Sequence, residues 1–435
     1  MFEVSRSVDR EVFALALPAL GALAAEPLYV LVDTAIVGHL GTTQLAALAI
    51  AATVLSTAFT IFNFLTYGTT AQVARLHGAG RDAQAAALGS QALWLAFGIG
   101  AVLLVALVAL AAPAVTLMGG EGEVADGAVL YLRIAALGSP FFMLATAGQG
   151  FLRGIGDLRT PLVILVVAHA VNAVLEVLLV YGFGWGLAGS AWGTVIAQVG
   201  MGLAFVAVQR RAGFERPQLE RMKSLMRIGT EIALRTTALL GSFLVASAVL
   251  ARVGPAALGA HQIAFQLFVF LALVLDALAI AGQVMVGGML GAGDADGARA
   301  ASVRMIGWSV VAGAAFGAVL LALGDVIPQA FTSDEAVIAQ AREIWWIFAL
   351  LMPANGAVFA LDGILIGAGD TRFLMWGMLS AAAVYVPVAL LALDRGWGIR
   401  GVWAGLAGLI LVRLATCGVR FAGSRWALTG APAPS

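Results

Sequence analysis

Residues 151–159, FLRGIGDLR, recur at 364–372 as ILIGAGDTR, a shift of 213 positions. Glycine-containing loops elsewhere in the chain repeat at nearly the same shift and in the same order. At shifts of 213 or 212 the matching pairs are Gly41 with Gly254, Gly78-Ala79-Gly80 with Gly291-Ala292-Gly293, and Gly184-Trp185-Gly186 with Gly396-Trp397-Gly398. Four matched loops in one order predict a chain built from two copies of one structural unit.

The composition indicates that lipid is the solvent for most of this chain. Of its 435 residues, 61% are hydrophobic and only 11% are charged, whereas a soluble domain is about half apolar and about a quarter charged. The formal net charge of zero gives no sign of a nucleic-acid partner. Cys417 is the only cysteine, so neither a disulfide framework nor a cysteine-based metal site is expected.

Breaks at Gly, Pro and charge clusters divide the sequence into twelve apolar segments, each about the 20 residues that a membrane-spanning helix requires. The predicted spans are 12–37, 45–73, 86–112, 127–152, 161–182, 188–208, 225–251, 258–288, 300–323, 337–366, 373–392 and 399–420. We therefore predict an all-α integral membrane protein with twelve transmembrane helices.

The positive charges predict how these helices are oriented. Most of the 24 Lys and Arg residues fall on one side of an alternating twelve-span topology, which by the positive-inside rule is the cytoplasm. This places both termini in the cytoplasm, and we expect a multi-pass protein of the cell membrane. With six spans in each half, the two copies enter the membrane in the same direction, as two pseudo-symmetric lobes. The predicted boundaries are 1–208 for the first lobe, 209–224 for a cytoplasmic linker, and 225–435 for the second lobe.

The first predicted span carries two acids where lipid disfavours them. Glu26 and Asp33 are seven residues apart, so they share a helix face about two turns, or roughly 10 Å, from each other. Pro18 and Pro27 lie in the same span, and a proline inside a helix frees a carbonyl and permits a bend. We interpret Pro18, Glu26 and Pro27 as a conformational switch and Asp33 as a functional acid. For Glu26 the alternative is a hydrogen bond between helices.

The fifth and sixth spans add polar groups to this set. Asn172 and Glu176 are four residues apart and therefore lie on one helix face, and Thr194 follows in the next span. Together with Asp33 they predict an oxygen-rich pocket suited to a proton or to a hard cation such as sodium. The alternative is that these groups only hold helices together by hydrogen bonds. Apart from sodium at these four residues, no metal site and no cofactor is expected.

In the second half the charges are open to two interpretations. Glu231 and Arg235 are four residues apart and can pair on one helix. Asp276 and Asp362 have no partner nearby in the sequence, so each either binds a cationic substrate or forms a salt bridge to Arg235 or Arg413. His169 and His261 lie in or near spans, and we expect structural hydrogen bonds from both.

Several of these motifs resemble one family. AAEPLYVLVDTAIVGHLG at 24–41 is similar to the first helix of multidrug and toxic compound extrusion (MATE) transporters, and specifically to their DinF-like branch. GAHQIAFQ at 259–266 and PANGAVFALDGILIGAGDTR at 353–372 support the same resemblance, which covers about residues 10–420.

The resemblance implies two six-helix lobes around a central cleft, with export of organic cations or amphipathic compounds against entry of protons or sodium ions. It places the family's first-helix Asp at Asp33, its bending Pro at Pro18, its fifth-helix Asn at Asn172 and its sixth-helix Thr at Thr194. This chain departs from the family at two positions. Glu176 stands where the family has Asp, and Asn355 stands where the NorM-like branch has an acid.

The sequence thus predicts an antiporter that works by alternating access as a monomer on small amphipathic or cationic molecules. A flippase for lipids or lipid-linked sugars is the alternative. Such a protein needs several cations for phosphate groups, and only Arg235 and Arg413 lie near the middle of predicted spans. An enzyme is not expected, because the sequence contains neither a nucleophile–base pair nor an HExxH motif.

Overall fold

The computed structural model describes residues 2–430, with side chains from Val8 onward, so residues 431–435 of the predicted second lobe lie outside it. Within this range all regular secondary structure is helical, and twelve helices are long and apolar enough to cross a membrane. The prediction of an all-α protein with twelve spans is confirmed. Each span is longer than predicted; the first, for example, covers Val8–Gly38.

Three of the twelve spans contain more than one helical element. A short 3₁₀ turn separates α2 from α3 and another separates α5 from α6, while a π-helical turn ends α7. The elements are α1 Phe2–Gly38, α2 Thr42–Thr60, η1 Ile61–Asn63, α3 Phe64–Gly78, α4 Asp82–Leu117, α5 Gly122–Ala135, η2 Ala136–Gly138, α6 Ser139–Gly154, α7 Arg159–Val177, η3 Leu178–Gly182, α8 Gly186–Ala212, α9 Leu219–Val253, α10 Pro255–Gly291, α11 Ala295–Ala322, α12 Val326–Phe331, α13 Glu335–Gly367, α14 Thr371–Asp394 and α15 Gly398–Ala422.

The chain divides into two compact units. The N-terminal unit comprises residues 21–229, and the C-terminal unit comprises residues 230–430 together with residues 2–20 of α1. The start of α1 is held in the C-terminal unit by Asp9, whose carboxylate accepts hydrogen bonds from Arg304 at 2.7 and 2.6 Å and from Trp308 Nε1 at 2.8 Å. Helix α1 therefore contributes to both units.

The non-helical segment between α8 and α9 is shorter than the predicted linker and is fixed to the N-terminal unit. It covers residues 213–218. From α4, Gln91 Nε2 donates to the Arg216 carbonyl at 2.9 Å, and Trp94 Nε1 donates to the Glu215 carbonyl at 3.0 Å. These bonds make the segment a strap across α4.

Glycines let the central helices of each unit pack with their backbones in contact. In the N-terminal unit a Cβ added at Gly150 of α6 would lie 2.8 Å from the Thr66 carbonyl oxygen of α3. In the C-terminal unit Gly363 of α13 meets the backbone of Ala279 of α10 in the same way. At the 213-residue shift Gly150 corresponds to Gly363 and Thr66 corresponds to Ala279. The two copies therefore share helix packing as well as sequence. Small residues at such crossings are typical of membrane bundles.

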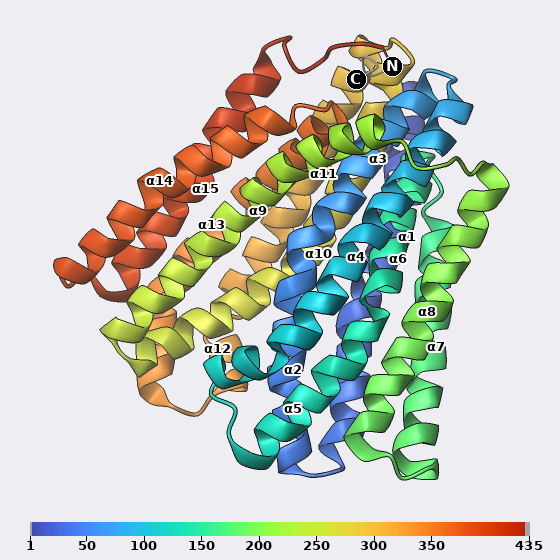
Figure 1. The fold of residues 1–435 in the computed structure, drawn as a ribbon. Helices are drawn as coiled ribbons and strands as arrows, with labels where there is room; N and C mark the ends of the chain where they lie inside the picture. Colours follow the sequence, from blue (N-terminus) through green and yellow to red (C-terminus); the bar gives the residue numbers. More distant parts are fainter. Residues whose placement is uncertain (1, 431–435) are drawn as a thin grey trace. The chain divides into compact units, whose positions relative to one another are not determined.

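Apolar side chains fill the C-terminal unit between these helices. Its largest core joins α9, α10, α13, α14 and α15, and includes the buried Trp345, Phe348 and Tyr385. In this unit α14 and α15, which are joined by the tight turn at Gly396, run side by side (Figure 1).

Candidate functional site

Asp33 lies in the second half of α1 and is buried within the N-terminal unit. Only 6% of its surface is exposed, and the Ser190 hydroxyl of α8 donates a 2.7 Å hydrogen bond to Asp33 Oδ1. A carboxylate taken out of water is strongly disfavoured unless it is paired or hydrogen-bonded. Ser190 supplies part of that compensation.

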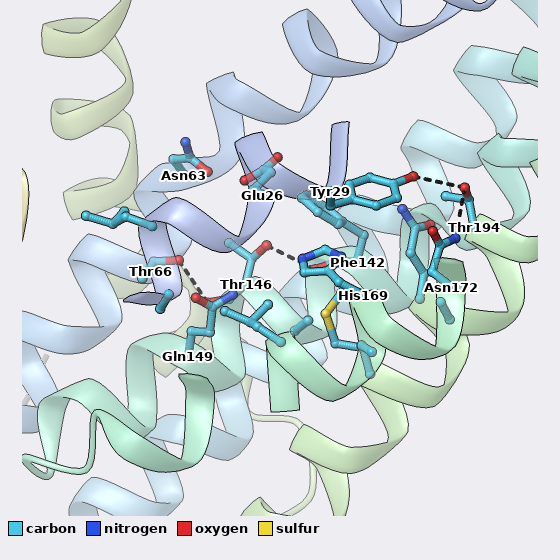
Figure 2. Close-up of a pocket in the computed structure, with 18 of the residues that line it drawn as sticks. Glu26, Tyr29, Asn63, Thr66, Phe142, Thr146, Gln149, His169, Asn172 and Thr194 are labelled. Carbon is cyan, nitrogen blue, oxygen red and sulfur yellow. Dashed lines mark hydrogen bonds between the residues drawn. The ribbon is translucent and has the colours of Figure 1, made fainter. Parts of the chain in front are cut away.

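The three other predicted residues of the pocket meet on α7 and α8 (Figure 2). Asn172 Nδ2 donates to Thr194 Oγ1 at 3.4 Å, and the Thr194 hydroxyl lies 3.5 Å from Glu176 Oε1. Glu176 is completely buried, and its carboxyl group lies beside that of Asp33. The structure therefore brings together all four residues predicted for a cation or proton site.

Two oxygens of this cluster have no hydrogen-bond partner among the described residues. They are Glu176 Oε2 and Asn172 Oδ1, and both are inaccessible to solvent. A buried oxygen left unpaired costs about 1–3 kcal/mol, and more if it is charged. Together with the two facing carboxyl groups, these oxygens are suited to a proton or a hard cation.

Local geometry explains how α7 and α8 come so close. A Cβ at Gly193 would lie 3.0 Å from Glu176 Cγ, and one at Gly189 would lie 2.8 Å from the Leu179 backbone. The π-helical turn at Leu178–Gly182 begins two residues after Glu176, and such turns frequently occur at functional sites.

Two aromatic residues of the site were not predicted from the sequence. The Tyr29 hydroxyl forms a 3.0 Å hydrogen bond with Thr194 Oγ1, and the Tyr29 ring stacks on His169 with ring centroids 4.8 Å apart (Figure 2). Tyr131 of α5 is buried beside Ser190 and Thr194. Spacing from Asp33 is the only sequence signal for Tyr29, which lies four residues earlier and therefore on the same helix face.

Two cavities in the N-terminal unit meet at this cluster. We name them the His169 cavity, of about 160 Å³, and the Asp33 cavity, of about 240 Å³. Asn172 and Arg153 line only the His169 cavity, whereas Asp33 lines only the Asp33 cavity. Both are lined by Glu26, Tyr29, Asn63, Phe142, Thr194 and Gln198.

The residues interpreted as a switch lie in a continuous helix. Helix α1 runs unbroken from Phe2 to Gly38 through both Pro18 and Pro27. Pro18 lies two residues before the point at which α1 passes from one unit to the other, and Glu26 lines both cavities.

In the C-terminal unit the charged residues contact one another. Asp362 Oδ2 accepts hydrogen bonds from Arg235 and, at 2.5 Å, from Arg413. Glu231, which spacing places beside Arg235, accepts a 2.5 Å hydrogen bond from Thr371 of α14. Asp276 is half-buried on α10.

His261 is buried among aromatic rings, with its ring centroid 6.0 Å from that of Trp403. Neither of its ring nitrogens has a hydrogen-bond partner in residues 2–430. The same part of the chain contains no group of three or more His, Cys, Asp or Glu side chains able to hold a metal ion.

Comparison with known proteins agrees with this architecture. The model of the MatE family matches residues 18–178 and again residues 232–391. Protein DETOXIFICATION 44, chloroplastic, of Arabidopsis thaliana is 31% identical over 427 residues, covering 94% of this chain and 81% of that protein. DNA damage-inducible protein F of Escherichia coli strain K12 is 30% identical over 425 residues, covering 94% and 90%.

Among solved structures, a crystal structure of MATE in the bent conformation has the same fold. Its TM-score is 0.87 at 20% sequence identity, with 97% of this chain and 96% of that chain covered.

Proposed function

Because this chain belongs to the MATE family of multidrug and toxic compound extrusion transporters, we propose that it exports amphipathic or cationic small molecules in exchange for protons or sodium ions. The resemblance predicted from sequence is confirmed, and the similarity to DNA damage-inducible protein F agrees with the DinF-like branch. Two separate family matches, one in each half, also agree with the internal repeat.

The facing carboxyl groups of Asp33 and Glu176 are the observation that carries the proposal. Two ionised carboxylates that are buried side by side repel each other strongly. The pair is therefore stabilised when it binds a proton or a cation and destabilised when it is empty and fully ionised. A site with this property can exchange an ion between the two sides of a membrane.

Coupling requires that ion binding change the conformation that substrates meet. Asp33 and Glu26 lie on α1, the helix that contributes to both units and contains Pro18 and Pro27. In the proposed cycle, an ion bound at Asp33, Asn172, Glu176 and Thr194 draws α1 toward α7 and α8. Release of the ion frees α1 to bend at its prolines, which changes the shape of the adjoining cavities.

The arrangement of the second unit supports export over lipid flipping. A flippase would use cationic side chains to bind phosphate, but Arg235 and Arg413 both bind Asp362. The proposal further places the chain in the cell membrane, as a monomer with both termini in the cytoplasm.

Transport by the purified protein in proteoliposomes tests this function. A fluorescent organic cation is the substrate, and proton and sodium gradients are imposed separately. We expect one of the gradients to drive accumulation in the wild type and in Glu121→Gln, which removes an exposed acid from the loop between α4 and α5. Asp33→Asn should lower the gradient-driven rate by about a hundredfold, since it removes one of two facing acids. Undiminished gradient-driven transport by Asp33→Asn would contradict the proposal.

A further inference from the structure

Glu26 differs from the other mid-membrane acids of the N-terminal unit. Its side chain is exposed, and no hydrogen bond or ion pair joins it to another residue in the described part of the chain. Asp33 and Glu176, in contrast, are buried and hydrogen-bonded. An unpartnered acid at this depth is costly to keep, which indicates a function that needs it free.

The walls around Glu26 define what it can bind. Figure 2 shows its carboxylate on α1 between Asn63 and Tyr29, at the junction of the two cavities. The Asp33 cavity contains two acids, Glu26 and Asp33, and no Lys, Arg or His among its described lining residues. Positive charge is therefore favoured there.

The His169 cavity has a different electrostatic character. It contains Arg153, which is buried and donates a 3.1 Å hydrogen bond to Gln149, and His169 itself. A cation at Glu26 is repelled by Arg153 if its body extends into this cavity and is not repelled if it extends into the other one. The charge distribution thus favours a cationic ligand at Glu26 whose body extends into the Asp33 cavity.

Aromatic rings complete the Asp33 cavity. Phe59 and Phe142 stack with centroids 4.5 Å apart and planes inclined by 21°, and Tyr29 and Tyr131 add two more rings to the wall. Flat aromatic compounds pack well against such rings, and a cationic centre is attracted to their faces. The combination of an unpaired carboxylate and aromatic walls fits one chemical class, the planar aromatic organic cation.

We propose that Glu26 is the specificity-determining residue that binds the positive charge of the transported compound, while its aromatic body occupies the Asp33 cavity. This inference rests on the proposed export function and deepens it. It also separates two roles among the mid-membrane acids of the N-terminal unit: Asp33 and Glu176 bind the coupling ion, and Glu26 distinguishes cationic substrates from neutral ones.

Equilibrium binding to the full chain in detergent tests this assignment with two dyes. Ethidium is a planar aromatic cation, and Nile red is an uncharged aromatic dye. We expect Glu26→Gln to weaken ethidium binding about tenfold and to change Nile red binding less than twofold. Glu26→Asp, which keeps the charge on a shorter side chain, should recover part of the ethidium affinity, and Glu121→Gln should bind both dyes like the wild type.

Two results would overturn the assignment. Equal ethidium affinity in the wild type and Glu26→Gln means that another residue binds the positive charge of the dye. Equal loss of both dyes means that Glu26 shapes the helix and does not bind the cation. Size-exclusion chromatography of each variant in the same detergent reports that it is folded. The dye-binding measurements need no ion gradient. They can therefore contradict the role of Glu26 while the wild type still shows ion-driven transport. Failure of this inference is thus distinguishable from failure of the proposed function.

Discussion

The two units share helix packing but differ in what occupies equivalent positions. The 213-residue shift places Ala246 at the position of Asp33 and Ala389 at the position of Glu176, and both alanines are completely buried in an apolar core. At the 212-residue shift of the last span, Leu406 replaces Thr194. The N-terminal unit thus builds a polar cluster where the C-terminal unit packs methyl groups. One framework accommodates either a binding site or a closed core.

The C-terminal unit also contains mid-membrane charges, and three of them are paired with one another. Asp362, Arg235 and Arg413 come from α13, α9 and α15, and hydrogen bonds join them. This difference teaches that a charged residue in a span is informative about function only when its partners are known. Paired charges hold helices together, whereas the two neighbouring acids of the N-terminal unit form the proposed ion site.

The strongest way to break the comparison is to give the C-terminal unit the acid that it lacks. Ala246→Asp buries a carboxylate in the apolar core of this unit, which should cost several kcal/mol and abolish the folded protein. Size-exclusion chromatography and thermal unfolding in detergent measure the outcome. Ala246→Ser is the matched control, which we expect to fold with a smaller loss. A stable Ala246→Asp protein would mean that this core tolerates a polar site.

Removing the acid from the paired cluster should have the next largest effect. Asp362→Asn removes the carboxylate that Arg235 and the buried Arg413 share, and the expected loss in the free energy of unfolding is about 3–5 kcal/mol. Thermal unfolding in detergent checks it.

Glu343→Gln is the control for this variant, because it removes the exposed 3.1 Å pair with Arg400. Its expected cost is less than about 1 kcal/mol. An Asp362→Asn protein with normal stability and no transport would instead assign Asp362 to substrate binding.

The smallest expected effect comes from removing one hydroxyl group. Tyr29→Phe deletes the hydrogen bond to Thr194, worth about 1 kcal/mol, and should weaken coupling-ion affinity about fivefold. The ion concentration that gives half-maximal transport is the quantity to measure. Tyr385→Phe in the C-terminal unit is the matched control, because the buried Tyr385 hydroxyl has no partner within residues 2–430. If both variants shift the ion dependence equally, the Tyr29 bond is not part of the ion site.

Hydropathy was sufficient to predict the helical framework. A span of roughly 20 apolar residues can satisfy its backbone in lipid only as a helix, so the twelve spans follow from composition and charge. The repeat of the glycine loops likewise predicted two related halves. These features depend on local sequence, which a single chain displays directly.

Partners between helices could not be predicted in the same way. The spacing of Glu231 and Arg235 suggested a pair on one helix, yet Glu231 bonds to Thr371 and Arg235 to Asp362. Which groups meet depends on the rotation and crossing of helices, and the sequence does not specify either. Ser190 and Tyr29 were missed for the same reason, since a hydroxyl in an apolar span has no distinctive pattern until its neighbour is known.

The glycine contacts have a consequence for how such a protein can diverge. Gly150 and Gly363 hold equivalent helix crossings through bare backbone, and neither contact involves a residue of the polar cluster. Side chains of the polar cluster on α1, α7 and α8 can therefore change their chemistry while these two crossings stay fixed. After a duplication, one copy can keep a polar cluster and the other can lose it without any change at the α3–α6 and α10–α13 contacts.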